Sequence, residues 1–431
     1  MALAETTGSG PRKVDWSSDE YKEKRRRRYA ADRRLQYYGI AAIATALGLL
    51  AILITSLVTT GYTAFTQTMV SVEITLDEER VNRDDVFNAN WRNIVRDAFK
   101  AATPGLETSD ERAYFAMFTN NAPFLVRDRV VRDPRMVGTT VTFTIPMADP
   151  VDQLAKGQIS RDTPENQRRV SDRQIAWFDG LAQQGMISQP FNTGLFVNSD
   201  SRFPELAGLA GAISGSFWAL LVCFCISFPC GIAAAIYLEE FAPKNRLTDL
   251  IEVNINNLAA VPSVVFGLLA LAVFIGWFNM PRSVPLVGGL ALALMTLPTI
   301  IIVTRASLKS VPSAIREAAL GVGASKHEVI LHHILPLAMP TILTGTIIGL
   351  AQALGETAPL LLIGMNAFIT SPPAGVLEPA TALPTQIFIW ADSPERGFVS
   401  RTSAAILVLL GFLITMNAIA IFLRQRFERR W

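Results

Sequence analysis

The hydrophobic pattern of this chain consists of long uncharged stretches separated by short charged ones. Six stretches contain no charged side chain, and each is at least as long as the roughly 20 residues that a membrane-spanning helix needs. They cover residues 35–72, 206–238, 253–281, 283–304, 329–355 and 402–423. The pattern predicts six transmembrane helices, the first of them at residues 39–61, followed later by a five-helix core over residues 207–424.

Between the first and second predicted spans, residues 62–206 change to a mixed polar pattern. Alternating hydrophobic positions predict a strand over residues 69–76, and β-branched residues predict another over 138–146. Helical patterns cover residues 84–102 and 163–184. The segment is long enough for a small α+β domain. It has no His, no Cys and no evident cluster of paired carboxylates, so docking or spacing is favoured over catalysis.

The distribution of charge predicts the orientation. Cytoplasmic loops of membrane proteins are enriched in Lys and Arg, whereas long segments cross the membrane regardless of charge. When residues 62–206 are left out for this reason, only three basic residues fall outside in a topology with the N-terminus inside: Arg282, Arg396 and Arg401. We therefore expect basic cytoplasmic tails at 1–38 and 425–431 and a periplasmic location for the inserted domain. The first tail is expected to lack fixed structure until its arginine-rich run meets the membrane surface.

The amino-acid composition excludes several classes of protein. Half of the residues are hydrophobic and 18% are charged, which excludes a disordered chain, a collagenous chain and a simple soluble enzyme. The net charge of +2 gives no indication of a nucleic-acid partner. All three Cys lie in one predicted span, and all three His share one loop, so neither a metal nor another cofactor is expected.

The loop between the fourth and fifth spans carries the most specific motif. It resembles the E-A-A loop of ATP-binding cassette (ABC) importer permeases, in which Glu-Ala-Ala is followed by Gly after three residues and later by Ile-x-Leu-Pro. The departure is His333 where Ile is usual, with Ile334 one place later. In the family this loop, here 317–336, docks on a separate ATPase. The residues assigned to it by the resemblance are Arg316, Glu317, Ala318, Ala319, Gly323, Leu335 and Pro336.

The same loop does not bind ATP itself. Its Gly321-x-Gly323-x-x-Lys326 lacks the Gly-x4-Gly-Lys-Ser/Thr spacing of a phosphate-binding loop, which occurs nowhere in the chain. We therefore expect no catalytic residues and no enzymatic activity of this chain's own.

Three further segments narrow the resemblance to the PstA-type phosphate permeases: residues 237–243, 257–268 and 353–360. The similarity covers roughly residues 206–431 and does not explain the insert. It implies a type I ABC importer permease core in the bacterial cytoplasmic membrane, in contact with membrane lipid. The implied partners are a PstC-like second permease subunit, two copies of a PstB-like ATPase and a PstS-like periplasmic phosphate-binding protein.

Glu356 is the acidic residue that falls inside a predicted span, where a carboxylate is costly unless it is paired or faces water. We assign Glu356, Thr357 and Arg305 to the translocation pathway or its gate, with Arg305 and Arg316 as candidate partners of the carboxylate. The alternatives are a structural salt bridge for Glu356 and a topology anchor for Arg305.

Other functions remain open at this point. A permease for another oxyanion, such as phosphonate or molybdate, has the same architecture. A membrane receptor with the inserted domain as sensor fits the first half of the chain, but no signalling region follows it. A polytopic membrane enzyme lacks a His-rich or paired-Asp cluster at the membrane surface.

Overall fold

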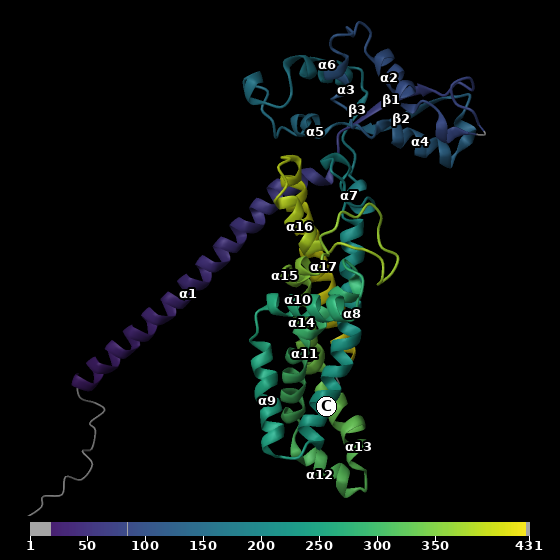
Figure 1. Ribbon diagram of the computed structural model, residues 1–431. Helices are drawn as coiled ribbons and strands as arrows, with labels where there is room; N and C mark the ends of the chain where they lie inside the picture. The colour runs from purple at the N-terminus through teal and green to yellow at the C-terminus, as the bar shows by residue number, and fades with distance from the viewer. Residues whose placement is uncertain (1–18, 84, 428–431) are drawn as a thin grey trace, which may run out of the picture. The chain divides into compact units, whose positions relative to one another are not determined.

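The structure is a computed structural model that describes residues 19–427 except residue 84. Internal contacts divide the chain into two units, residues 1–57 and 58–431. The described part of the first unit is one helix, most of α1 (Asp19–Gly61) (Figure 1). Within the expected tail at 1–38, the residues from Asp19 onward are helical, and i,i+4 pairs such as Arg27–Glu23 support the helix. The rest of that tail, and residues 428–431 of the other, lie outside the described residues.

The predicted membrane spans are largely confirmed. Among the described residues, five helices are long and apolar enough to cross a membrane, and a bent helix pair raises the number to six if it counts as one span. Four of the five belong to the second unit and form a bundle (Figure 1). They are α8 (Ala210–Ile236), α11 (Pro285–Ser310), α14 (Leu335–Gly355) and α17 (Gly397–Phe427).

The third predicted span, residues 253–281, is wrong as a single helix. The structure has α9 (Arg246–Ala259) and α10 (Ser263–Ala270), the latter extended by a π-helical turn over Leu271–Trp277. The two parts are bent by 102° at the break. Pro262 explains the break, because it lacks an N–H group and disfavours helical geometry in the residue before it.

Small residues allow the bundle helices to approach closely. A Cβ added at Gly289 of α11 would lie 2.6 Å from the carbonyl oxygen of Ala219 and 2.5 Å from Cβ of Val222, both on α8. On α14, a Cβ at Gly345 would lie 2.3 Å from a methyl group of Val303. Helix association in lipid depends on such packing, because lipid provides no hydrophobic driving force between helices.

The insert, residues 62–206, contains its own sheet and apolar core. Its three strands are β1 (Met69–Thr75), β2 (Thr140–Pro146) and β3 (Ile187–Ser188), with β1 in the centre and antiparallel to both neighbours. The two predicted strands are thus confirmed. The core residues alternate along β1, where Val70, Val72 and Ile74 are buried. The helices of the insert are α2 (Trp91–Ala102), α3 (Glu111–Phe115), α4 (Ala122–Arg132), α5 (Asp149–Ala155), α6 (Asp172–Gln183) and α7 (Gly194–Val197).

The two predicted helices of the insert are shorter than expected. The first begins at Trp91 because the Asn90 side chain caps it, accepting a hydrogen bond from the N–H of Asn93. The second begins at Asp172, after a capping box formed by Ser171 and Gln174. Caps thus set boundaries that hydrophobic periodicity alone placed too early.

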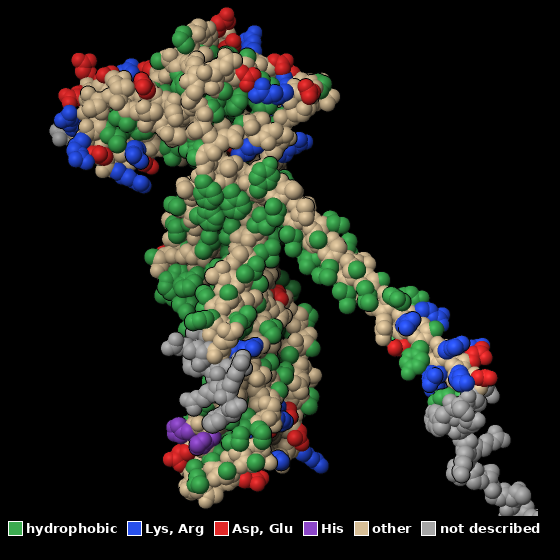
Figure 2. Space-filling model, turned by 180° about the vertical axis from the view of Figure 1, so that it is seen from behind, with side chains coloured by type: hydrophobic (Ala, Val, Ile, Leu, Met, Phe, Trp, Pro, Cys, Tyr) green, Lys and Arg blue, Asp and Glu red, His purple; other side chains and the backbone are tan. Residues whose placement is uncertain are grey.

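Short helices complete the second unit at both ends of the bundle (Figure 1). We call the end that carries residues 313–328 the loop end, and the end next to residues 62–206 the insert end. Charged side chains gather at the loop end and on the insert, and the visible face between them is mostly hydrophobic or uncharged (Figure 2). The remaining short helices are α12 (Ser313–Gly321), α13 (Lys326–Glu328), α15 (Ala358–Leu362) and α16 (Leu383–Ala391).

We predict that Gly289→Val destabilises the bundle by about 1–3 kcal/mol, because the added side chain overpacks the contact between α11 and α8. Gly411→Val is the matched control, since a Cβ at Gly411 on α17 meets no atom within 4 Å. Thermal unfolding of both variants in the same detergent measures the difference. Equal unfolding temperatures would contradict the packing argument.

Candidate functional site

The segment that resembles the E-A-A loop folds as a helical hairpin at the loop end of the bundle. Helix α12 ends at Gly321, and the chain turns at Gly323, whose positive φ of 90° suits glycine. Ser325 and Glu328 then form a capping box that starts α13. This helix continues through a π-helical turn, Val329–Ile334, directly into α14. The loop is therefore continuous in backbone with a membrane helix.

The inner face of the hairpin is packed against the bundle. Ala319, Ile330 and Ile334 are buried in an apolar cluster with Leu308 of α11 and Ala338 of α14. Ile334 is 1% exposed whereas the neighbouring His333 is exposed. The departure from the family pattern therefore costs no packing, because Ile334 and not residue 333 fills the core in the π-helical turn.

The outer face of the hairpin is uncovered within the described chain. Glu317 and Ala318 are exposed. Beyond them lie two exposed apolar side chains, Leu320 at 53% and Val322 at 86%. A carboxylate flanked by small and apolar residues is a surface that another protein can bury, as interface cores are poor in charge.

Arg305 and Arg316 form ion pairs near the hairpin, but not with Glu356. The Arg305 guanidinium contacts Glu252 of α9 and lies 3.4 Å from the Glu239 carboxylate, in the π-helical turn Tyr237–Phe241 that extends α8. Arg316 of α12 donates to the Glu240 carboxylate of the same turn at 2.6 Å. The candidate pairing of either arginine with Glu356 is therefore wrong.

Geometry explains why Glu356 is out of reach. Gly345 faces Val303 and Gly349 faces Thr299, so α14 runs antiparallel to α11. Arg305 is thus level with about residue 343, near the middle of α14, and Glu356 follows the last residue of that helix. At 1.5 Å per residue, roughly 20 Å of helix separates them. The structure does not bring Arg305 together with Glu356 and Thr357.

Glu356 itself lies in a helix break. Its backbone is extended between α14 and α15, with φ −74° and ψ 122°, and Thr357 directly precedes α15 without a capping side-chain hydrogen bond. The side chain is partly exposed. Across residues 19–427 without residue 84, its carboxylate has no hydrogen-bond or ion-pair partner. A carboxylate at such a position requires water or a cation from another chain.

Two other features bear on ligand binding. No group of three or more His, Cys, Asp or Glu is arranged to hold a metal ion within the described residues. A cavity of about 230 Å³ lies between α8, α14 and α17, with an almost entirely apolar lining that includes Phe217, Leu350 and Met416. Such a lining offers an oxyanion few hydrogen-bond donors.

Glu239, Glu240 and Glu252, the partners of the two arginines, were not predicted from the sequence. A signal for the first two was present, because segment 237–243 carries part of the family resemblance. Nothing in the local pattern linked this segment to Arg305 or Arg316, which lie 66 and 76 residues further along the chain.

We predict that Arg316→Gln lowers the free energy of unfolding by about 1–3 kcal/mol, because it leaves the Glu240 carboxylate without its cation. The Glu240 side chain is only 6% exposed. The control is Lys309→Gln, since Lys309 also pairs with a carboxylate but is 59% exposed. Limited proteolysis and thermal unfolding measure the effect. A Lys309 variant as unstable as the Arg316 variant would contradict this interpretation.

Comparisons with known proteins assign two different families to separate parts of the chain. The family "Binding-protein-dependent transport system inner membrane component" matches residues 227–431. A "Domain of unknown function (DUF3333)" matches residues 22–165, which cover α1 and most of the insert.

Three similar proteins are permeases. The phosphate transport system permease protein PstA of Yersinia pestis is 33% identical over 213 residues, which cover 49% of this chain and 71% of that protein. The PstA of Haemophilus influenzae is 30% identical over 244 residues, or 55% and 81% of the two chains. The probable ABC transporter permease protein YqgI of Bacillus subtilis is 29% identical over 231 residues, or 49% and 76%. On these similarities, together with its apolar helices and its helical hairpin, the chain belongs to the PstA-type family of ABC transporter permeases.

Proposed function

We propose that this chain is the membrane-spanning permease subunit of an ATP-driven importer for inorganic phosphate. The observation that carries the proposal is the hairpin 317–336, packed on one face and uncovered on the other. The phosphate substrate is supported by the names of the relatives from Yersinia pestis and Haemophilus influenzae. Residues 207–424 form the type I permease core in this proposal, with both tails cytoplasmic and the insert periplasmic.

The hairpin is the contact for a PstB-like ATPase, present in two copies. Glu317, Ala318 and the exposed Leu320 and Val322 face the ATPase. The buried side chains beneath them belong to one cluster with α11 and α14. Because such a packed cluster resists compression, movement of α12 on ATP binding displaces these two helices rather than the loop alone. The pathway then alternates between outward and inward access.

The remaining partners follow from the same architecture. A PstS-like binding protein delivers phosphate at the insert end, and a PstC-like subunit completes the pathway. Glu356 and Thr357 lie at the helix break where the second subunit can supply a cation. A bare carboxylate repels phosphate, so Glu356 acts as a gate or ion-pair residue rather than as a ligand. Arg305, held by Glu239 and Glu252, stabilises the inner end of the same pathway.

Uptake of radiolabelled phosphate tests the function directly. Cells that lack their own phosphate importer express this chain with its partner subunits under phosphate limitation. Saturable uptake that disappears when the ATPase is inactivated supports the proposal. If an assembled complex takes up no phosphate but transports phosphonate or molybdate, the permease assignment stands and the substrate is wrong.

Within this assay, Glu317→Lys is expected to abolish uptake, because it reverses the charge at the centre of the proposed ATPase contact. The variant still inserts into the membrane, since Glu317 is exposed and makes no buried contact. Glu165→Lys, an exposed charge reversal in the insert, is the control. Normal uptake by the Glu317 variant would sink the assignment of the loop.

For the pathway, we expect Glu356→Gln to lower uptake by about tenfold, which corresponds to about 1.4 kcal/mol. The isosteric amide keeps the shape of the break but removes the charge, whereas Glu356→Asp keeps the charge and retains more activity. Glu165→Gln is the control for amide substitution. If the Gln and Asp variants transport equally well, the charge of Glu356 has no part in transport.

A further inference from the structure

A buried ionic cluster joins the insert to the first turns of α17. It contains three carboxylates, Asp149 and Asp152 of α5 and Glu205 of the 3-10 turn Pro204–Leu206, and two cations, Lys156 and Arg401. The exposed fractions of the three acids and Arg401 lie between 5% and 9%. We call these five residues the Asp149 cluster. No such cluster is evident in the sequence of the insert, because Glu205 meets the two aspartates only in the folded chain.

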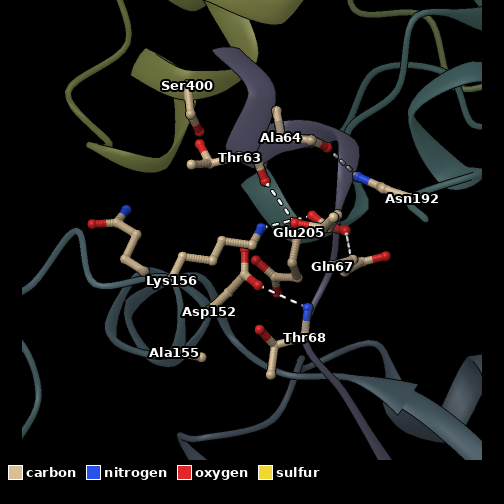
Figure 3. A network of polar contacts seen from close by, with 12 residues as sticks. Thr63, Ala64, Gln67, Thr68, Asp152, Ala155, Lys156, Asn192, Glu205 and Ser400 are labelled. Carbon is tan, nitrogen blue, oxygen red and sulfur yellow. Dashed lines mark hydrogen bonds and ion pairs between the residues drawn. The ribbon is translucent and has the colours of Figure 1, made fainter. Parts of the chain in front are cut away.

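The cluster is held by hydrogen bonds to the segment that leads into β1. Asp152 accepts from the backbone N–H of Thr68 at 2.8 Å and from Lys156 Nζ at 2.6 Å. The same Nζ donates to the carbonyl oxygen of Thr66 at 2.7 Å. Figure 3 shows Lys156 and Asp152 beside this segment and close to Glu205. One side of the cluster is thus fixed to the sheet of the insert.

The other side is fixed to α17. Arg401 donates to the carbonyl oxygen of Ala207 at 2.6 Å. At Gly397, the first residue of α17, an added Cβ would lie 1.9 Å from Oδ1 of Asp149. The Asp149 carboxylate therefore rests directly against the backbone of α17, in a position that only glycine leaves open.

The charges of the cluster do not balance when all groups are ionised. Three carboxylates face two cations, which leaves one buried negative charge. The charged groups that face Asp149 are Asp152 on its own helix, Lys156 just after that helix, Glu205 on the 3-10 turn and Arg401 on α17. Burial, with smaller effects of Asp152 and Glu205, raises the pKa of Asp149 to about 6, against the hydrogen bond from Gln153 and the charge of Arg401. Burial also raises the pKa of Glu205 and lowers that of Lys156.

We propose that the Asp149 cluster is a proton-dependent positioning site that fixes the insert to the N-terminal end of α17, at Gly397 and Arg401. With Asp149 protonated the cluster is neutral and the junction is closed. Ionised Asp149 adds an uncompensated buried charge, and the junction opens more often. The inference matters for transport because α17 packs along α14, whose last residue precedes Glu356. The effect on transport rests on the proposed function, whereas the pH-dependent opening of the junction does not.

The direction of the pH effect follows from linkage. A carboxyl group whose pKa is higher in the closed junction than in the open one stabilises the closed junction as pH falls, and this stability is lost as pH rises through about 6. With an ordinary pKa in the open state, opening is expected to increase roughly tenfold between about pH 5 and about pH 7.5.

Hydrogen–deuterium exchange of the assembled transporter in lipid nanodiscs tests this without any substrate. The peptides of interest cover residues 63–70, 203–208 and 397–405, with rates corrected for intrinsic exchange. The wild type should show the roughly tenfold step, and Asp149→Asn should reduce it severalfold because Asp149 no longer titrates. Glu205, whose pKa burial also raises, contributes the step that remains. Asp179→Asn is the control, since Asp179 forms an exposed ion pair with Arg161 in the same insert. An undiminished step in the Asp149 variant, or no step in the wild type, would overturn the proposal.

A charge-rescue experiment separates positioning by charge from a merely structural role. Arg401→Gln should increase opening because it leaves more negative charge in the cluster. Adding Asp149→Asn to this variant returns the net charge to that of the wild-type cluster with Asp149 ionised, so exchange at about pH 7.5 should return toward the wild-type rate. Failure of the second change to rescue the first contradicts the proposal. The pH profile of phosphate uptake by the same variants is then a separate readout, so loss of the phosphate assignment leaves the exchange result intact.

Discussion

The exclusion of unpaired charge from hydrocarbon is the constraint on which the rest of this structure depends. Arg305 and Arg316 are placed at the loop end and neutralised by carboxylates of α8's extension and of α9. Arg401 is placed at the insert end, in the Asp149 cluster. Between these ends the helices associate by close packing at glycines such as Gly289 and Gly345. These three arginines thus belong to two separate sites, one at each end of the bundle, and Glu356 lies outside both.

The two ends are linked by helices rather than by a chain of polar contacts. At the loop end, Ala319 and Ile334 share an apolar cluster with α11 and α14. Helix α14 then runs to the break that holds Glu356, and α17 packs along it to the Asp149 cluster. A displacement of the hairpin therefore reaches the insert end through packed helices. This arrangement suits a transporter, in which the energy source and the entrance of the pathway lie on opposite sides of the membrane.

The Asp149 cluster gives the insert a fixed place on the permease core. Buried ion pairs often add little net stability, because desolvation offsets their attraction, but they penalise alternative arrangements strongly. A cluster with Arg401 on one side and Asp152 bonded to Thr68 on the other specifies one junction rather than many. Because the cluster has one carboxylate more than it has cations, the stability of this junction depends on whether Asp149 carries a proton.

The sequence by itself determined the spans other than the third, the strands β1 and β2, and the position of the loop that folds as the hairpin. These features depend on residues close together in the chain: an apolar run long enough for the bilayer, alternation over seven residues, and a motif within one loop. Tertiary structure alone decided the partners of Arg305 and Arg316, the isolation of Glu356 and the meeting of Asp149 with Glu205. Such contacts join groups tens to hundreds of residues apart. The residues next to a charged side chain in the sequence do not indicate which group will neutralise it. The physical reason is that hydrophobic pattern is read from neighbouring residues, whereas pairing depends on which ends of the helices come together.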